Sequence, residues 1–147
     1  MNKGIAIKNV SLWALLSWAL AALLTGCAGM GGTTSKVELY GAQEVPPVTT
    51  SATGTGTITV GEDGSVSGSI TTTGVAAHAA HIHTGNAGRN GPVIIPLTKT
   101  SDNVWTVPAG AKLTPEQYQS YKAYGLYINV HSPKHKGGEI RGQLGPQ

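Results

Sequence analysis

Apolar and polar residues alternate along much of the chain after residue 36, which is the periodicity of β-strands with one buried face. In residues 54–60 a glycine or aliphatic residue occupies every second position and threonine occupies the others. After a turn at residues 62–64, the stretch 66–70 alternates in the same way with serine. This pattern predicts a β-hairpin with one apolar face and one hydroxyl face.

Shorter alternating stretches predict the remaining strands, at residues 37–39, 79–84, 93–97, 104–107, 126–131 and 139–144. One helix is expected near 115–124, because Thr114, Pro115 and Gln117 form a capping-box start and Gly125 provides a stop. Short strands with a single helix predict an all-β fold, an antiparallel Greek-key sandwich or barrel.

The first part of the chain has a different pattern. Lys3 and Lys8 precede an apolar run over residues 10–24, which is typical of a secretory signal and is shorter than the roughly 20 apolar residues of a spanning helix. The sequence at residues 24–27, Leu-Thr-Gly-Cys, resembles the bacterial lipobox. The resemblance implies that residues 1–26 are a lipoprotein signal peptide and that Cys27 is acylated.

We therefore expect a flexible tether over residues 27–35 and a folded domain over 36–147. The expected location is the bacterial cell envelope, with the domain extracytoplasmic and held at a membrane by the lipid. Ala28 after the cysteine indicates the outer membrane if the cell is Gram-negative, facing either the periplasm or the surface.

Composition narrows the classes of function. The net charge of +3 includes Lys3 and Lys8, so the processed chain is close to neutral and we expect no nucleic-acid partner. Cys27 is the single cysteine, so no disulfide can form within the chain. Asp63 and Asp102 both fit turns, and no Ser-His-Asp or paired-carboxylate arrangement indicates a hydrolase.

The candidate chemistry lies in the histidines. His81 and His83 share one side of their predicted strand, opposite the aliphatic side chains, and His131 shares the corresponding side of a later strand with Tyr127 and Asn129. If the aliphatic sides face the core, all three imidazoles point outward. If the two strands are also neighbours, the three rings converge on one point.

Two readings of this cluster remain open: a metal site, or histidines that only hydrogen-bond neighbouring groups. Neutral imidazoles bind copper, zinc and nickel, and copper has the highest intrinsic affinity, so we expect copper ahead of zinc. His78 can join as a fourth ligand only through a bulge, and His135 is expected in an exposed loop. Metal affinity is expected to fall as the pH drops through about 6.5.

Five blocks of the sequence, taken in order, resemble the CHRD domain, which is named for chordin and also occurs in secreted bacterial proteins. They lie at residues 44–47, 81–85, 90–93, 127–131 and 138–143. The resemblance covers residues 37–144 and implies a β-domain that functions outside the cytoplasm. The biochemical activity of the family is poorly defined, so the resemblance indicates the domain rather than a reaction.

The His81-Ile82-His83 and Val130-His131 pairs are also similar to the copper-binding elements of Cu/Zn superoxide dismutases. The chain lacks a counterpart to the zinc loop and the disulfide of those enzymes. We therefore expect a copper-holding site, or redox chemistry on a small oxidant. Arg141 or Arg89 could attract an anion to it. The alternative is a non-enzymatic module that binds a protein or an envelope polymer.

Overall fold

The computed structural model describes residue 1 and residues 31–147. The expected signal peptide, Cys27 and the first part of the tether lie outside the described residues. Within the described part, no helix is both long enough and apolar enough to cross a membrane.

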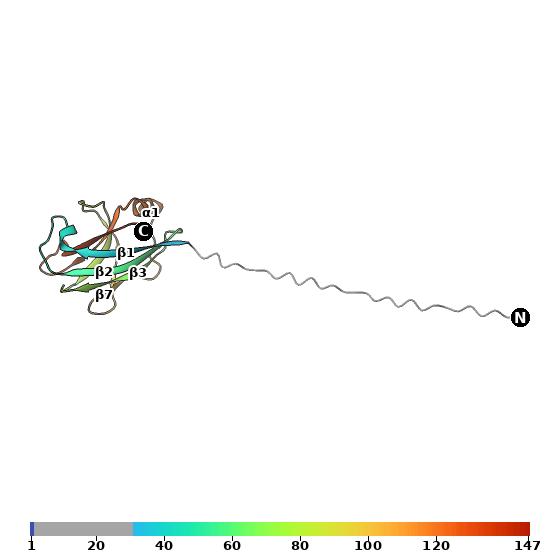
Figure 1. Cartoon of the computed structure of the whole chain (residues 1–147), viewed down its shortest axis with the longest axis horizontal. Helices are drawn as coiled ribbons and strands as arrows, with labels where there is room; N and C mark the ends of the chain where they lie inside the picture. Colours follow the sequence, from blue (N-terminus) through green and yellow to red (C-terminus); the bar gives the residue numbers. More distant parts are fainter. Residues whose placement is uncertain (2–30) are drawn as a thin grey trace.

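Residues 31–147 form nine strands, one 3-10 turn and one α-helix. Figure 1 shows their arrangement. In chain order they are β1 (Gly32–Tyr40), η1 (Gly41–Gln43), β2 (Thr53–Gly61), β3 (Val66–Thr73), β4 (Ala79–Thr84), β5 (Val93–Pro96), β6 (Thr98–Lys99), β7 (Val104–Thr106), α1 (Pro115–Lys122), β8 (Leu126–His131) and β9 (Ile140–Leu144). The prediction of an all-β antiparallel fold with one short helix is confirmed.

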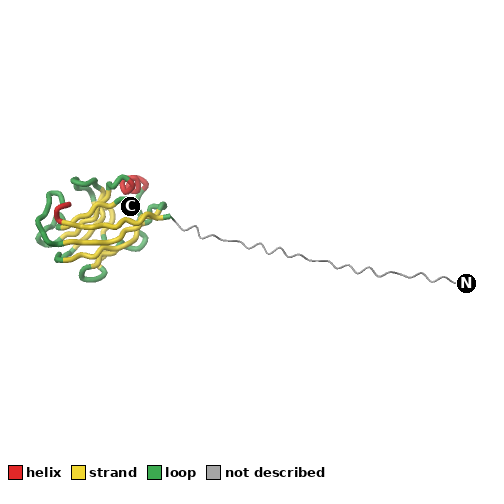
Figure 2. Tube along the Cα trace, viewed as in Figure 1, coloured by secondary structure: helices red, strands yellow, loops and turns green. Residues whose placement is uncertain are grey.

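All strands belong to one sheet, in the order β5-β4-β8-β9-β1-β2-β3-β7-β6. The two edge strands of this sheet, β5 and β6, are separated in the chain by Leu97 alone. The sheet therefore curls round until its edges nearly meet and forms an almost closed barrel (Figure 2). Such closure leaves little unpaired strand edge.

One face of the curled sheet encloses a continuous apolar core. The inward residues of the predicted hairpin, Ile58, Val60, Val66 and Ile70, belong to it together with Trp105. Their threonine and serine neighbours point away from the core, as the alternation predicts. Burying each of these aliphatic side chains contributes about 1.5–3 kcal/mol, so the alternation also selects the register.

Glycines within β2 and β3 let these two strands approach each other closely. Gly68 has a φ of 123°, and a Cβ placed there would lie 2.9 Å from the Cα of Ile58 on β2. A side chain at this position would force the two strands apart, which explains the glycine within an otherwise regular alternation.

Two strands differ from the expectation. β1 begins at Gly32, so residues 32–35 of the expected tether form ladder pairs with β2 instead. Ser35 is buried there and hydrogen-bonds the hydroxyl of Tyr121, which fixes the early start of the strand. β6 has only two residues, too few to show a periodicity.

The helix begins as predicted, with a full capping box between Thr114 and Gln117. It ends earlier than expected, because Tyr124 rather than Gly125 adopts the positive φ, 56°. The amide of Gly125 then donates to the carbonyl of Ser120 at 2.7 Å and closes the last turn.

Candidate metal centre

The histidine cluster is assembled by the pairing of β4 with β8. These antiparallel strands set Ala79 opposite His131, His81 opposite Asn129, and His83 opposite Tyr127. Ile82 and Val130 point into the core from the same strands, so the histidines lie on the opposite face. One ring nitrogen from each of His81, His83 and His131 lies within 4.8 Å of the other two. The predicted convergence of these three residues is therefore present in the structure.

Backbone carbonyls fix the tautomers of two of these rings. The Nδ1 of His83 donates to the carbonyl of Gly91 at 3.0 Å, and the Nδ1 of His131 donates to the carbonyl of Lys136 at 2.9 Å. A carbonyl can only accept, so the proton sits on Nδ1 and the lone pair is left on Nε2. The same arrangement orients metal-binding histidines in metalloproteins.

The third ring completes the cluster through a direct contact. The Nδ1 of His81 lies 3.0 Å from the Nε2 of His131, so His81 donates a hydrogen bond to that lone pair when no ion is present. The His81 and His131 ring centroids are 4.8 Å apart and those of His81 and His83 are 5.6 Å apart. Three imidazoles at these separations can all reach one small cation.

The cluster faces away from the core, as predicted, but loops cover it. His83 is 7% exposed, His131 is 9% exposed, and His81 is partly buried. Burial lowers the pKa of all three imidazoles below 6.5, and the neighbouring histidines lower those of His81 and His131 further. The rings are therefore neutral at physiological pH, which is the form that binds a metal.

The other two histidines lie outside this group. His78 is exposed just before β4, and its backbone amide donates to the carbonyl of His131 at 3.0 Å. His78 is not among the three residues whose ring nitrogens lie within 4.8 Å of one another. His135 is partly exposed in the loop between β8 and β9, as expected, and its amide and carbonyl form a turn with Ser132.

Two stacked side chains, those of Tyr127 and Arg141, support the ring of His83. The His83 ring lies parallel to that of Tyr127, with centroids 4.7 Å apart and planes inclined by 9°. The guanidinium carbon of Arg141 lies 3.5 Å from the centroid of the Tyr127 ring. The Tyr127 hydroxyl accepts a hydrogen bond from the amide of Gly91, the residue whose carbonyl fixes His83.

Arg141, one of the two residues expected to attract an anion, is buried against the loop after β4. Its side chain is 1% exposed, and its NH2 group donates to the carbonyls of Asn86 and Arg89, both at 3.0 Å. These contacts hold the loop after β4 over the cluster. Arg89 is exposed on that loop.

Sequence reasoning did not single out Asn129 and Glu44 as parts of the site. Both are buried, at 2% and 4% exposure. Gly138, with a φ of 133°, packs against both residues, and a Cβ there would lie 2.6 Å from Asn129 Nδ2 and 2.7 Å from Glu44 Cδ. Burial raises the pKa of Glu44 to about 7, although Arg141 opposes the shift. The sequence signal for Asn129 was its position two residues from both Tyr127 and His131, which places all three side chains on the same face of the strand.

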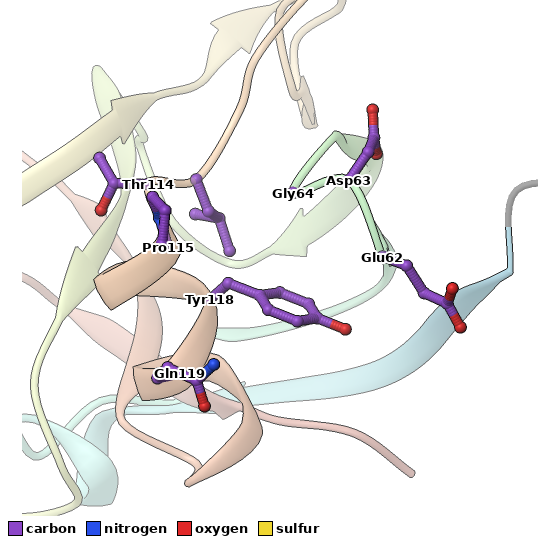
Figure 3. A pocket seen from close by; sticks show the side chains of 8 residues that line it. Glu62, Asp63, Gly64, Thr114, Pro115, Tyr118 and Gln119 are labelled. Atoms are coloured by element: carbon purple, nitrogen blue, oxygen red, sulfur yellow. The ribbon is translucent and has the colours of Figure 1, made fainter.

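A separate pocket of about 230 Å³ lies between the β2–β3 turn and the start of α1 (Figure 3). The Tyr118 ring extends from the helix toward the turn that carries Glu62 and Asp63. Asp63 forms an ion pair with Lys112 at 2.9 Å. This pocket shares no residue with the histidine cluster.

The fold and the site together define a nearly closed β-barrel that carries three neutral, converging imidazoles on its outer face. The family model of the CHRD domain matches residues 35–144, so the chain belongs to the CHRD domain family. No curated protein and no solved structure matches the chain.

Proposed function

We propose that this CHRD domain binds one copper ion through His81, His83 and His131. The observation that carries the proposal is the fixed tautomer of His83 and His131, which leaves an unprotonated Nε2 on each ring, in a cluster where one ring nitrogen from each histidine lies within 4.8 Å of the others. Among divalent first-row metals, copper binds such nitrogen sites most tightly. Exposed His78 is close enough in sequence to be tested as a further ligand.

The role that fits this site is copper holding, or redox chemistry on a small oxidant such as superoxide. A bound copper ion would supply one-electron chemistry by cycling between Cu(II) and Cu(I). The protein would hold the neutral imidazoles in place and restrict access, because His83 and His131 are covered while His81 is partly exposed.

Calorimetric titration with Cu(II) and with Cu(I), on protein purified without a metal-affinity column, tests the binding. The wild type is expected to bind one ion, and His83→Ala and His131→Ala are expected to lose that binding. His135→Ala is the matched control and is expected to bind as the wild type does. Equal affinity in all four proteins would eliminate the site.

The competing function is a non-enzymatic interaction module in which the histidines only stabilise the loops. The hydrogen bond between His81 and His131 is the observation that favours it, because it satisfies both rings without an ion. In that case copper and chelator would leave the melting temperature unchanged. A bound ion would instead raise it, because only the folded state assembles the ligands.

We also propose that Cys27 is acylated and anchors the domain in the bacterial cell envelope. The support is the apolar run over residues 10–24 and the Leu-Thr-Gly-Cys sequence that ends at Cys27. The mass of protein extracted from membranes is expected to match a chain that begins at Cys27 and carries acyl groups. A chain that retains residues 1–26 would contradict the anchor.

A further inference from the structure

Asn129 lies at the centre of the polar face that carries the histidines. Its partner across β4 is His81 and its partner across β9 is Arg141. His131 lies two residues further along β8 and therefore shares its face, and His83 lies diagonally across β4. Asn129 thus adjoins each of the three histidines, and its side chain is 2% exposed.

The amide of Asn129 is oriented by its nitrogen. Nδ2 donates to the carbonyl of Gly137 at 3.2 Å, on the side where Gly138 and Glu44 pack. The amide is planar, so Oδ1 faces away from Gly137 and toward the histidine side. Within the described residues, Oδ1 is buried and has no hydrogen-bond donor.

His83 presents a matching unpaired atom. Its Nδ1 proton is donated to Gly91, and its Nε2 is buried without a partner in the described part of the chain. Each of these two buried acceptors is unfavourable without a donor, because it has lost its hydrogen bonds to water and gained none in return. A cation is attracted to both lone pairs at once.

From this geometry we infer that Asn129 Oδ1 is the fourth, oxygen ligand of the metal centre, completing a set with His81, His83 and His131. The inference rests on the proposed function and deepens it. An amide oxygen is a hard ligand, so a set of three imidazole nitrogens and one oxygen favours Cu(II) over Cu(I). On this view the fourth position belongs to Asn129 rather than to His78.

Two substitutions separate the oxygen from the nitrogen of the amide. Asn129→Leu removes both, whereas Asn129→Asp keeps an oxygen at the ligand position, replaces the Nδ2 donor and adds a negative charge that also favours a cation. In full-length protein in detergent, the leucine variant is expected to bind Cu(II) about tenfold more weakly or worse. The aspartate variant should retain or exceed wild-type affinity. Asn103→Leu, at an exposed position, is the matched control.

A measurement on the wild type covers the case in which a variant fails to fold. Nuclear magnetic resonance with Zn²⁺ as a diamagnetic probe should shift the side-chain Cγ and Nδ2 resonances of Asn129. The side-chain resonances of Asn103 should stay in place. A variant's melting temperature in chelator shows independently whether its apoprotein is folded.

The outcomes distinguish this inference from the proposal on which it rests. If the wild type binds Cu(II), His83→Ala does not, and Asn129→Leu binds as the wild type does, the oxygen ligand is overturned and the three-histidine site stands. An aspartate variant as weak as the leucine variant also overturns it, because the Gly137 hydrogen bond would then explain the loss. A wild type that binds no metal overturns both.

Discussion

At the scale of single residues, the site depends on which nitrogen of each imidazole carries the proton. The carbonyls of Gly91 and Lys136 hold that proton on Nδ1 of His83 and His131, so each Nε2 carries a lone pair that can bind an ion. The sequence predicts the three histidines and their shared face through simple alternation. It does not predict the tautomers, because the two carbonyls belong to loops whose path leaves no periodic pattern.

Glu44 gives a pH-dependent prediction at this scale. Burial raises its pKa from 4.5 to about 7, so the folded state keeps a proton that the unfolded state releases above 4.5. Its contribution to stability is therefore complete below pH 4.5 and is lost as the pH rises through about 7. Glu44→Gln removes this dependence. Relative to the wild type, the variant should gain on the order of 2 kcal/mol between pH 5 and pH 8, after allowing for partial solvent screening.

Urea unfolding of metal-free protein at several pH values in that interval measures the effect. Glu38→Gln, at an exposed position on β1, is the matched control and should show no such trend. A constant difference between Glu44→Gln and the wild type across the interval would contradict the raised pKa.

At the scale of elements, the loops after β4 and β8 turn an outward sheet face into a covered site. The bounds of β4 and β8 and the capping-box start of α1 agree with the sequence prediction, because each depends on neighbouring residues. The covering of the histidine cluster by loops depends instead on contacts between residues that are far apart in the sequence. Arg141 on β9 holds the carbonyls of Asn86 and Arg89, and alternation along β9 gives no indication of those partners.

The substitution Arg141→Lys tests whether Arg141 holds the loop after β4 over the histidine cluster. A lysine keeps the charge but has no planar guanidinium to hold two carbonyls and stack on Tyr127, so buried acceptors lose their donors. We expect a loss of about 2–4 kcal/mol in the free energy of unfolding and weaker copper binding, because the loop also carries Gly91. Thermal unfolding and copper titration measure the two effects.

Arg89→Lys, at an exposed position on the same loop, is the matched control and should change neither the stability nor the copper affinity. Equal behaviour of the two variants would refute the role of Arg141.

At the scale of the whole molecule, the order of the strands in the sheet brings the site together. His81 and His131 come from strands that are distant in the chain and adjacent in the sheet. Alternation predicts which face each strand presents, but it leaves the neighbours of each strand open. From the sequence, the histidines could be predicted to converge only if their two strands were neighbours. The order β5-β4-β8-β9 shows that β4 and β8 are neighbours.

Native mass spectrometry of the protein extracted from membranes of copper-fed cells tests the central claim most directly, since it counts metal ions on the intact chain. Our account predicts one copper ion on the wild type and on His135→Ala, and none on a chain with both His83→Ala and His131→Ala. Copper-free wild-type protein, or equal copper on all three chains, would contradict the claim that these imidazoles form a metal site.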